Sequence, residues 1–385
     1  MWRAVASNAI TLLLVALFLL GGVILWGQSE YKAAGPLQEA ICLQVPRGST
    51  MARVSGDLQT QGAISNDVIF RLGADYTEKA QDLKAGSFLV PPGASMAEIV
   101  DIITRGGASS CGTEVVYRIG VARVTFELRE LDPATSRYVE KAEFDPAEGA
   151  VPEAFQQASA QAGTRHRVAL AEGVTSWQVV EGLKAIDLLQ GEVPELPAEG
   201  ALAPDSYEFQ AGDTRVEVLG RMAAAQDAIL AAAWEARAPG LPLSSPEEAL
   251  ILASIIEKET AVAEERRVVA SVFVNRLNRG MRLQTDPTVI YGITQGQGIL
   301  GRGLRQSELR RETPWNTYVI PALPPTPIAN PGRASIEAAL NPEQTDFVFF
   351  VADGTGGHVF AKTLAEHNAN VAKWRKIEAE RRAQD

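Results

Sequence analysis

The chain has 385 residues, room for roughly two or three compact domains, and 46% of them are hydrophobic, as in globular proteins with a packed core. Acidic residues outnumber basic ones by 47 to 36, and the basic residues are scattered along the chain. This pattern lacks the basic footprint of a nucleic-acid groove, so we exclude nucleic acid as a partner.

The amino-terminal segment is the first predicted element. No charged side chain occurs from Ala4 through Ser29, and the centre of this run is apolar. A helix of this length crosses the hydrocarbon core of a bilayer, which is roughly 30 Å thick. Trp26 lies where the run ends, and no clean small-x-small cleavage site follows, which favours an uncleaved anchor over a signal peptide. We predict that residues 1–35 form a short cytoplasmic end and a transmembrane helix, with the rest exported.

A short pattern, Gly-x-[Ser/Thr]-x-x-x-[Val/Ile], recurs after the anchor. The glycine supports the turn out of a strand, the hydroxyl caps the next helix, and the branched residue begins the buried face of that helix. The pattern therefore predicts strand-turn-helix units, with strands at 41–45, 87–90 and 166–170. Its copies run from Gly48 to Val54, from Gly93 to Ile99 and from Gly173 to Val179.

Residues 36–112 are predicted to form a small βα module, and the repeated pattern resembles the LysM family of glycan-binding modules. Ordinary helix capping, which occurs in many βα folds, is the alternative interpretation. Cys42 and Cys111 lie near the two ends of the module. Export permits a disulfide between them, but the sequence leaves a bridge and two separate buried thiols equally open.

Beyond the module the pattern changes twice. Residues 113–164 contain alternating segments at 115–119 and 124–128, followed by an acidic Pro- and Ala-rich stretch, which predicts a hairpin and a linker insertion. Residues 165–385 are mainly helical, with a final predicted strand at 347–351. The predicted fold class is α+β, with an N-terminal transmembrane helix, a small LysM-like βα module and a mixed α+β domain with a helical core.

The best-delimited helix of this last domain begins at Ser245. Pro246 occupies the first helical position, and Glu248 completes the pattern of a capping box. We predict that this helix continues to about residue 260 and that a second helix follows at 266–279.

Two glutamates near the end of the first helix are candidate functional residues. Ala253 and Ser254, three and four positions before Glu257, leave room beside its carboxyl group, whereas Glu259 follows two isoleucines in the equivalent places. We predict that a sugar reaches Glu257 and that Glu259 packs or pairs with a basic residue. For an arbitrary glutamate, a plain surface charge is the commoner interpretation.

Long motifs resemble the MltG (YceG-like) family of endolytic murein transglycosylases. They agree in order and spacing over nearly all of the chain beyond the anchor, except for residues 114–163, which have no counterpart. The matching blocks are APDSY at 203–207, ASIIEKETA at 253–261, VASVFVNRL at 269–277, MRLQTDPTVIYG at 281–292, PWNTY at 314–318, LPP at 323–325, IANPG at 328–332, and VADGTGGHVF at 351–360 with His367 and Asn368.

The resemblance implies that residues 165–385 are the catalytic domain and that Glu257, the first glutamate of Glu-Lys-Glu, is the catalytic acid. Other residues at family motif positions become candidates for the wall of the substrate cleft. Loop architecture is the alternative for these, with a turn at Asp286 and with Tyr291 in the core. The five candidates are Gln284, Asp286, Tyr291, Asn316 and Tyr318.

The resemblance also implies an activity, namely lytic cleavage of the β-1,4 bond between MurNAc and GlcNAc within peptidoglycan strands. This leaves 1,6-anhydromuramoyl ends and terminates strand elongation. One carboxyl group suffices, because the attacking group is the C6 hydroxyl of the muramic acid itself. No metal or cofactor is expected. The expected partners are peptidoglycan strands, the lipid bilayer and peptidoglycan synthases, and the expected location is the inner membrane, in a single pass, with the catalytic domain in the periplasm.

Two alternatives stay open at this point. A hydrolytic muramidase would use Asp286 to activate water and would leave reducing ends instead of anhydro sugars. A non-enzymatic glycan-binding scaffold of the envelope would hold strands through the LysM-like module and release nothing from them.

Overall fold

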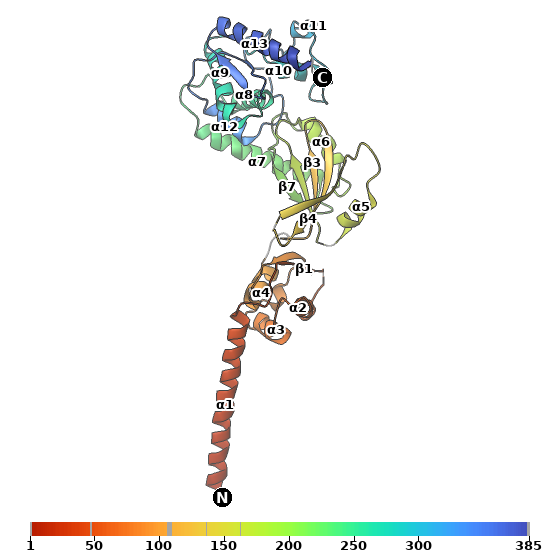
Figure 1. Cartoon of the computed structure of the whole chain (residues 1–385), viewed down its shortest axis with the longest axis vertical. Coiled ribbons are helices and arrows are strands. Elements are labelled where there is room, and N and C mark those ends of the chain that lie inside the picture. Colours follow the sequence, from red (N-terminus) through yellow and green to blue (C-terminus); the bar gives the residue numbers. More distant parts are fainter. Residues whose placement is uncertain (1, 47, 106–109, 136, 162, 383–385) are drawn as a thin grey trace. The chain divides into compact units, whose positions relative to one another are not determined.

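The computed structural model describes residues 2–46, 48–105, 110–135, 137–161 and 163–382 (Figure 1). Its architecture is mixed α+β, as predicted. The chain divides into two compact units. The first comprises Met1–Val116, Glu127–Glu143 and Ala150–His166, and the second comprises Tyr117–Phe126, Phe144–Gly149 and Arg167–Asp385.

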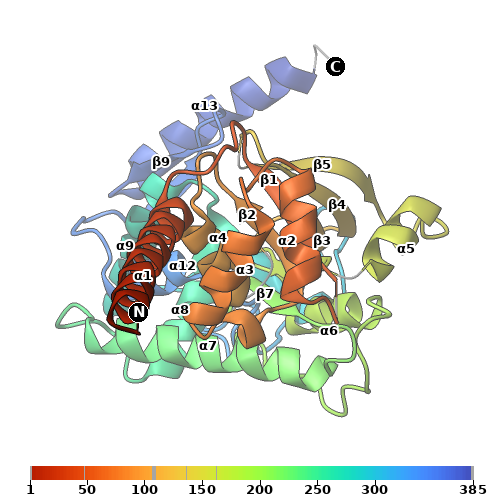
Figure 2. The ribbon, with the colours of Figure 1, turned by 90° about the horizontal axis from the view of Figure 1, so that it is seen from below.

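A small module with its own core lies in the first unit. Strands β1 (Ile41–Val45) and β2 (Gly86–Val90) pair antiparallel, and the core is built from residues between Tyr31 and Ile103. Helices α2 and α3 lie side by side, as do α3 and α4 (Figure 2). The helical segments are α2 (Met51–Thr60), α3 (Asp67–Tyr76), the short 3-10 helix η1 (Ala80–Asp82) and α4 (Met96–Thr104).

The repeated capping pattern forms the predicted strand-turn-helix units. Thr50, Ser95 and Thr175 are the N-cap residues of α2, α4 and α6 (Ser176–Lys184). Each hydroxyl accepts a hydrogen bond from the backbone N–H three residues later, which satisfies one of the free donors of the first turn. The branched residues that follow them are all buried: Val54, Ile99 and Val179.

A disulfide joins Cys42 on β1 to Cys111, with Cα atoms 5.8 Å apart. The sequence alone left this open, because the distance between two residues 69 positions apart depends on the fold. The bridge links the first strand of the module to the segment that follows α4, so the two ends of the module are covalently tied.

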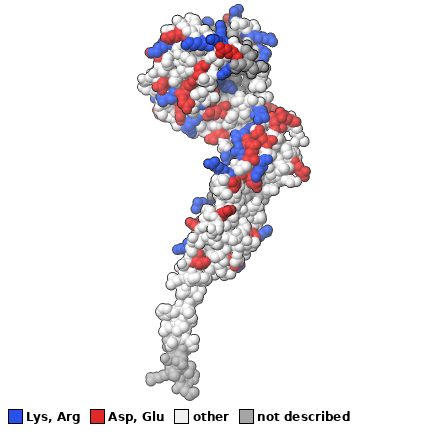
Figure 3. All heavy atoms as spheres, in the orientation of Figure 1, with Lys and Arg blue, Asp and Glu red and all other residues white. Residues whose placement is uncertain are grey.

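Helix α1 (Trp2–Lys32) precedes this module. Within it, Thr11–Lys32 is one candidate membrane span of 22 residues, with a mean hydropathy of 2.1. Its apolar stretch is not buried in the protein, whereas Tyr31 near its end lies in the core of the module. The described part of the helix is almost free of charged side chains (Figure 3). This length and composition are compatible with a membrane anchor, and a signal sequence can have the same length and composition.

A five-stranded sheet has the order β5-β4-β3-β6-β7. The predicted hairpin corresponds to β3 (Thr113–Ile119) and β4 (Val124–Asp132). A further strand, β5, and helix α5 occupy the stretch in which the sequence predicted a linker. No β5 side chain is fully buried, and charged residues interrupt the apolar ones along its sequence, RYVEKAEF, so the segment lacks a regular apolar alternation that would predict a strand. The other elements are β5 (Arg137–Phe144), α5 (Glu153–Ala160), β6 (Arg165–Leu170) and β7 (Ser206–Phe209).

Helices form the core of the second unit. Helix α8 (Pro246–Glu259) packs against α7 (Arg215–Glu235), α9 (Arg266–Asn278) and α12 (Arg333–Leu340). The side chains of residues 251–256 are all buried in this core. The predicted bounds of α8 and α9 are correct to within about a residue. The short helix η2 (Ala263–Glu265) lies between α8 and α9, and α10 (Asp286–Thr294) and α11 (Gln306–Leu309) lie between α9 and α12.

The N-terminus of α8 differs from the predicted capping box in one bond. The hydroxyl of Ser245 accepts from the N–H of Glu248 at 3.3 Å, as predicted. The Glu248 carboxylate, however, accepts from the backbone N–H of Ser244 at 2.7 Å. The reciprocal bond of the cap therefore reaches one residue earlier along the chain than in a standard capping box.

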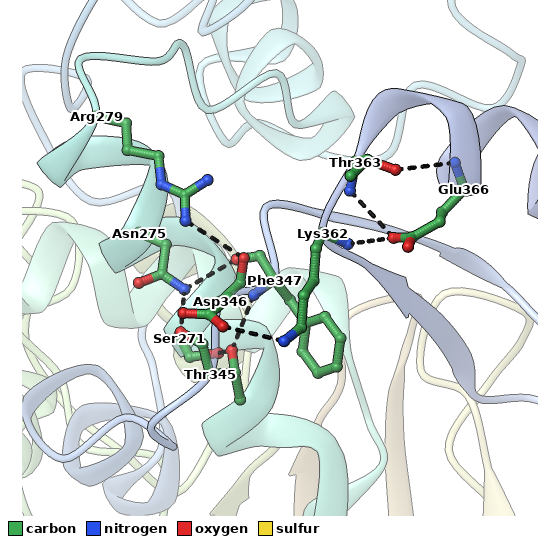
Figure 4. A network of polar contacts seen from close by, with 9 residues as sticks. All are labelled: Ser271, Asn275, Arg279, Thr345, Asp346, Phe347, Lys362, Thr363 and Glu366. Atoms are coloured by element: carbon green, nitrogen blue, oxygen red, sulfur yellow. Dashed lines mark hydrogen bonds and ion pairs between the residues drawn. The ribbon is translucent and has the colours of Figure 1, made fainter.

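The C-terminal part contains a hairpin of β8 (Phe349–Ala352) and β9 (His358–Ala361), followed by α13 (Leu364–Arg382). Strand β8 begins two residues later than predicted. The carbonyls of Thr345 and Phe347 accept hydrogen bonds of 2.8 and 2.9 Å from the side chain of Asn275 on α9. Figure 4 shows this network, in which Lys362 also pairs with Asp346 at 3.0 Å. The side chains of α9 thus occupy the approach to the hairpin.

Candidate active site

Helix α8 ends in Glu-Lys-Glu, and this last turn carries two carboxyl groups out of the core. The side chains of residues 251–256 are buried, whereas Glu257, Lys258 and Glu259 are half-buried. Two steps along a helix correspond to about 200° of rotation, so Glu257 and Glu259 point to different sides. Each carboxyl group therefore has its own set of neighbours.

Glu257 lies beside two glycines. Its Oε2 accepts a hydrogen bond of 2.9 Å from the backbone N–H of Gly332, the N-cap residue of α12. A Cβ on Gly332 would come within 1.8 Å of the Glu172 carboxylate. Gly173 has a φ of +79°, and a Cβ there would lie 3.6 Å from the Glu257 side chain. Glycine at position 332 thus leaves space for Glu172, while position 173 requires glycine for its backbone conformation.

Charged groups surround Glu257. Burial raises the pKa of Glu172, and the negative charge of Glu257 raises it further, while Arg266 acts in the opposite direction. The Lys258 ammonium donates to the carbonyl of Gly173 at 3.2 Å. Burial lowers the pKa of Lys258, against the opposing charges of Glu257 and Glu199. The carboxyl group of Glu257 therefore lies in a partly dehydrated site with acidic and basic neighbours.

Asn330 holds the two glycine-bearing segments together. The N–H of Gly173 donates to its carbonyl at 2.9 Å, and its own N–H donates to the carbonyl of Val174 at 2.8 Å. Its fully buried amide donates to the same Val174 carbonyl and accepts from the N–H of Leu202. The sequence placed Gly173 in a repeat and Asn330 in a motif block, but neither pattern identified them as neighbours of Glu257.

The space beside Ala253 and Ser254 is filled by protein. Both side chains are fully buried, and the hydroxyl of Ser254 accepts from the N–H of Ile328 at 3.0 Å. We predicted that these small residues leave room for a sugar. They instead admit the segment from Ile328 to Gly332, which is the segment that binds the Glu257 carboxylate.

Glu259 has different surroundings. The hydroxyl of Thr285 donates a hydrogen bond to its Oε1. Burial raises the pKa of Glu259, and the negative charge of Asp286 adds to this, while the Thr285 hydrogen bond and the charges of His358 and Arg276 oppose it. Within the described part of the chain Glu259 forms no ion pair. It packs as predicted, but its polar partner is a hydroxyl instead of a basic residue.

Three of the predicted cleft residues lie on segments that are joined to each other. The phenol of Tyr318 donates to Oδ1 of Asp286 at 2.6 Å, and burial followed by this contact raises the pKa of Tyr318. Gln284 has a left-handed φ of +53°, and its N–H donates to the carbonyl of Thr317 at 3.1 Å. Because Thr285, which lies between Gln284 and Asp286, donates to the Glu259 carboxylate, this group belongs to the Glu259 side of the helix.

Tyr291 and Asn316 lie elsewhere. Tyr291 packs against Trp315 with ring centroids 5.7 Å apart, and burial next to Glu199 raises its pKa. The Asn316 amide is fully buried, donates to three backbone carbonyls and accepts from the N–H of Tyr318. It therefore positions the loop that carries Tyr318. Contact with substrate stays a prediction for all five residues.

Comparison with known proteins identifies the family. The match to the YceG-like family spans residues 43–373. The chain belongs to the YceG-like family. A Bacillus subtilis protein named endolytic murein transglycosylase is 27% identical over 372 residues, which are 92% of this chain and 91% of that protein. A Streptococcus pneumoniae protein of the same name is 29% identical over 340 residues, 86% of this chain and 58% of that protein.

A crystal structure of a yceG-like protein from Listeria monocytogenes is also similar. It is 26% identical, covers 86% of this chain and 99% of its own, and superposes with a TM-score of 0.46. The family match over residues 43–373 confirms the resemblance expected from the motif blocks at the level of the YceG-like family.

Replacing Glu259 by Gln should change how the stability of this YceG-like protein depends on pH. Because burial raises the pKa of Glu259, the folded state keeps its proton over an interval in which the unfolded chain has released it. Stability therefore falls as the pH rises through that interval. In thermal unfolding from about pH 4 to about pH 8, the Tm of the Glu259→Gln variant minus the Tm of the parent should increase as the pH rises. A difference in Tm that is constant with pH would contradict this.

Proposed function

We propose that this protein is an endolytic lytic transglycosylase that cleaves the β-1,4 bond between MurNAc and GlcNAc within peptidoglycan strands and leaves 1,6-anhydromuramoyl ends. Membership of the YceG-like family over residues 43–373 carries the proposal, because two of its relatives are named endolytic murein transglycosylase. Cleavage of nascent strands ends their elongation, which makes peptidoglycan synthases the candidate protein partners.

Glu257 is the proposed acid and base. The Gly332 N–H binds its Oε2, while its Oε1 has no hydrogen-bond partner among the described residues. The bound oxygen acts as an acceptor, so Oε1 is the oxygen that can carry a proton to a substrate. A backbone donor also fixes the orientation of the carboxyl group, which proton transfer requires.

The proposed reaction needs one carboxyl group and no water. Glu257 gives its proton to the glycosidic oxygen as the bond from that oxygen to C1 of MurNAc breaks. The C6 hydroxyl oxygen of the same MurNAc forms a new bond to C1, and its proton passes to the Glu257 carboxylate. The acid is thereby restored, and the intramolecular attack has a high effective concentration.

A hydrolytic muramidase is the second candidate function, and one observation favours it. Thr285 donates a hydrogen bond to the Glu259 carboxylate, and Asp286 is the next residue along the chain. Burial raises the pKa of Glu259, and the negative charge of Asp286 adds to this, so the two carboxyl groups belong to one site. Ordinary glycosidases use such a pair, with one group as acid and the other to activate water or attack the sugar. In this mechanism Glu259 would be the acid and Asp286 the base.

Digestion of purified sacculi by the full-length protein in detergent separates the two functions. We expect mass spectrometry of the released fragments to find 1,6-anhydromuramoyl ends. Reducing muramic ends in their place would support the hydrolytic mechanism and reject the proposed one. The absence of any released fragment would favour the non-enzymatic scaffold.

The Glu257→Gln and Glu259→Gln variants are matched controls on one helix. The amide at 257 keeps the shape of the side chain but cannot donate and recover a proton. We expect it to lower the cleavage rate by at least roughly 10²- to 10⁴-fold, with a much smaller loss at 259. Anhydro ends from a well-folded Glu257→Gln protein would move the catalytic role to Glu259.

Two further proposals concern the first unit. The exposed apolar helix α1 supports a single-pass anchor in the inner membrane, with the catalytic domain on the periplasmic side. The module of residues 36–112 is proposed to bind glycan strands without cleaving them. Its strand-turn-helix units support a LysM-like function.

The isolated segment of residues 36–112 tests the role of the module. Its separate hydrophobic core and the bond between Cys42 and Cys111 favour independent folding. We expect this segment, with its disulfide intact, to sediment together with purified sacculi. If it unfolds cooperatively on heating but stays in the supernatant, glycan binding by the module is wrong.

A further inference from the structure

A cavity of about 730 Å³ in the second unit is lined by three arginines. Arg266 and Arg267 begin α9, and Arg333 begins α12. Much of the remaining wall consists of alanine side chains from α7, η2 and α12, and the one acidic residue of the lining is Glu337. The cavity therefore combines positive charge with a smooth, apolar surface.

The three guanidinium groups are poorly neutralised. The Nε of Arg266 is buried without a hydrogen-bond partner, and its Nη2 is 4.0 Å from the Glu172 carboxylate. Arg267 donates from Nε to the carbonyl of Asn341 at 2.8 Å and forms no ion pair among the described residues. Arg333 is exposed, and it forms neither a hydrogen bond nor an ion pair with any residue that the structure describes. Gathered like charges favour an anion, and the planar guanidinium suits a carboxylate best.

This cavity is linked to the proposed catalytic acid by two short routes. Arg333 directly follows Gly332, whose N–H binds the Glu257 carboxylate. The pKa of Glu172 responds to the charge of Glu257, and the Glu172 carboxylate is also the ion-pair partner of Arg266, at 4.0 Å. A substrate group bound to these arginines would therefore lie next to the reacting sugar.

We propose that this cavity binds the carboxylate groups of the peptide stems that MurNAc carries, so that the enzyme prefers peptide-bearing strands. The inference rests on the proposed function. The stem is attached to the same sugar whose C1 reacts, so a stem site has to lie beside the acid. The alanine walls match the small side chains of such short peptides, and the arginines match their free carboxylates.

The test compares peptide-bearing strands with strands whose stems have been removed by an amidase. We expect the parent to have a KM for peptide-bearing strands that is lower by roughly tenfold or more, the worth of a charged hydrogen bond. Arg333→Gln should raise that KM toward the value for stripped strands. It should leave kcat unchanged, and it should leave the KM for stripped strands unchanged. Arg375→Gln, which removes the same charge from exposed α13, should change neither.

The outcomes of this comparison separate the stem site from the proposed activity. Equal KM values for both substrates, unchanged by Arg333→Gln, would overturn the stem site and leave the proposed activity standing. No anhydro ends from either substrate would reject the activity itself. Free stem peptide should inhibit, and its amidated form should not. Equal inhibition by inorganic phosphate would show a site for small anions in general and overturn the stem assignment.

Helix α3 supplies an independent second inference. Val68, Leu72 and Tyr76 follow each other at four-residue spacing and are 49%, 63% and 81% exposed. Phe70 and Ala74, on the opposite side, are fully buried in the core of the module. The helix therefore has two apolar faces, of which only one is covered by protein.

The uncovered face lies close to the end of the membrane span. A Cβ on Gly73 of α3 would meet the Tyr31 ring at 2.2 Å, and the Ser65 hydroxyl donates to the Glu30 carboxylate at 2.7 Å. Glu30 is the first charged residue after the uncharged run, so this contact is at the level of the membrane surface. Figure 1 shows α3 at the end of the module from which α1 projects.

We infer that the stripe of Val68, Leu72 and Tyr76 inserts into the headgroup region of the bilayer that α1 crosses. This rests on α1 being a membrane span. An amphipathic helix of this kind buries its apolar face about 5–10 Å deep, and tyrosine favours the interface. The contact would hold the module flat against the membrane surface.

Spin labels on the full-length protein in liposomes test this insertion. We expect a label at Leu72→Cys to be accessible to oxygen and shielded from a water-soluble nickel chelate. A label at Gln59→Cys, exposed on α2, should show the reverse. Equal nickel accessibility at both sites, in protein that sediments with the liposomes, would overturn the insertion. Protein that does not sediment with the liposomes would reject α1 as the anchor.

Discussion

The burial of helix α8 is the constraint on which the candidate site depends. Its side chains from residue 251 to residue 256 lie in the core formed with α7, α9 and α12. A helix packed in this way cannot rotate without opening cavities or exposing apolar surface. The directions of Glu257 and Glu259 are therefore set by the core, although neither residue is part of it.

Ser254 extends this control to the neighbouring chain. Its hydroxyl donates to the carbonyl of Ile251 at 2.7 Å and accepts from the N–H of Ile328 at 3.0 Å. Four residues later, Gly332 donates to Glu257. A buried hydroxyl on α8 thus fixes the segment that in turn fixes the carboxyl group, and Asn330 connects the same segment to Gly173. The precision of the site comes from buried hydrogen bonds around it.

Charge is distributed unevenly around the two glutamates. Glu257 has an acidic neighbour in Glu172 and basic ones in Lys258 and, beyond Glu172, Arg266. Around Glu259, burial is the largest influence on the pKa, and a hydroxyl is the polar partner. Environments that differ in this way around paired carboxyl groups separate their chemical roles. The arginine cavity next to Glu172 adds positive charge on the Glu257 side, where an anionic substrate group can be held.

The sequence by itself determined what depends on neighbouring residues. The hydroxyls of Thr50, Ser95 and Thr175 cap their helices because a cap needs only the three residues that follow it. The apolar run of α1 and the bounds of α8 are local in the same sense. The predicted bounds also placed Glu257 in the last turn of α8. Because residues two positions apart on a helix differ by about 200°, the sequence also implied that Glu257 and Glu259 point to different sides.

Only the tertiary structure decided which distant residues meet. The bond from Gly332 to Glu257, the disulfide between Cys42 and Cys111 and the buried amide of Asn316 all depend on chain segments brought together by packing. The sequence read Ala253 and Ser254 as space for a sugar, but that space is filled by the segment from Ile328 to Gly332. Small side chains permit close approach, and the identity of what approaches is set by the free energy of the whole core.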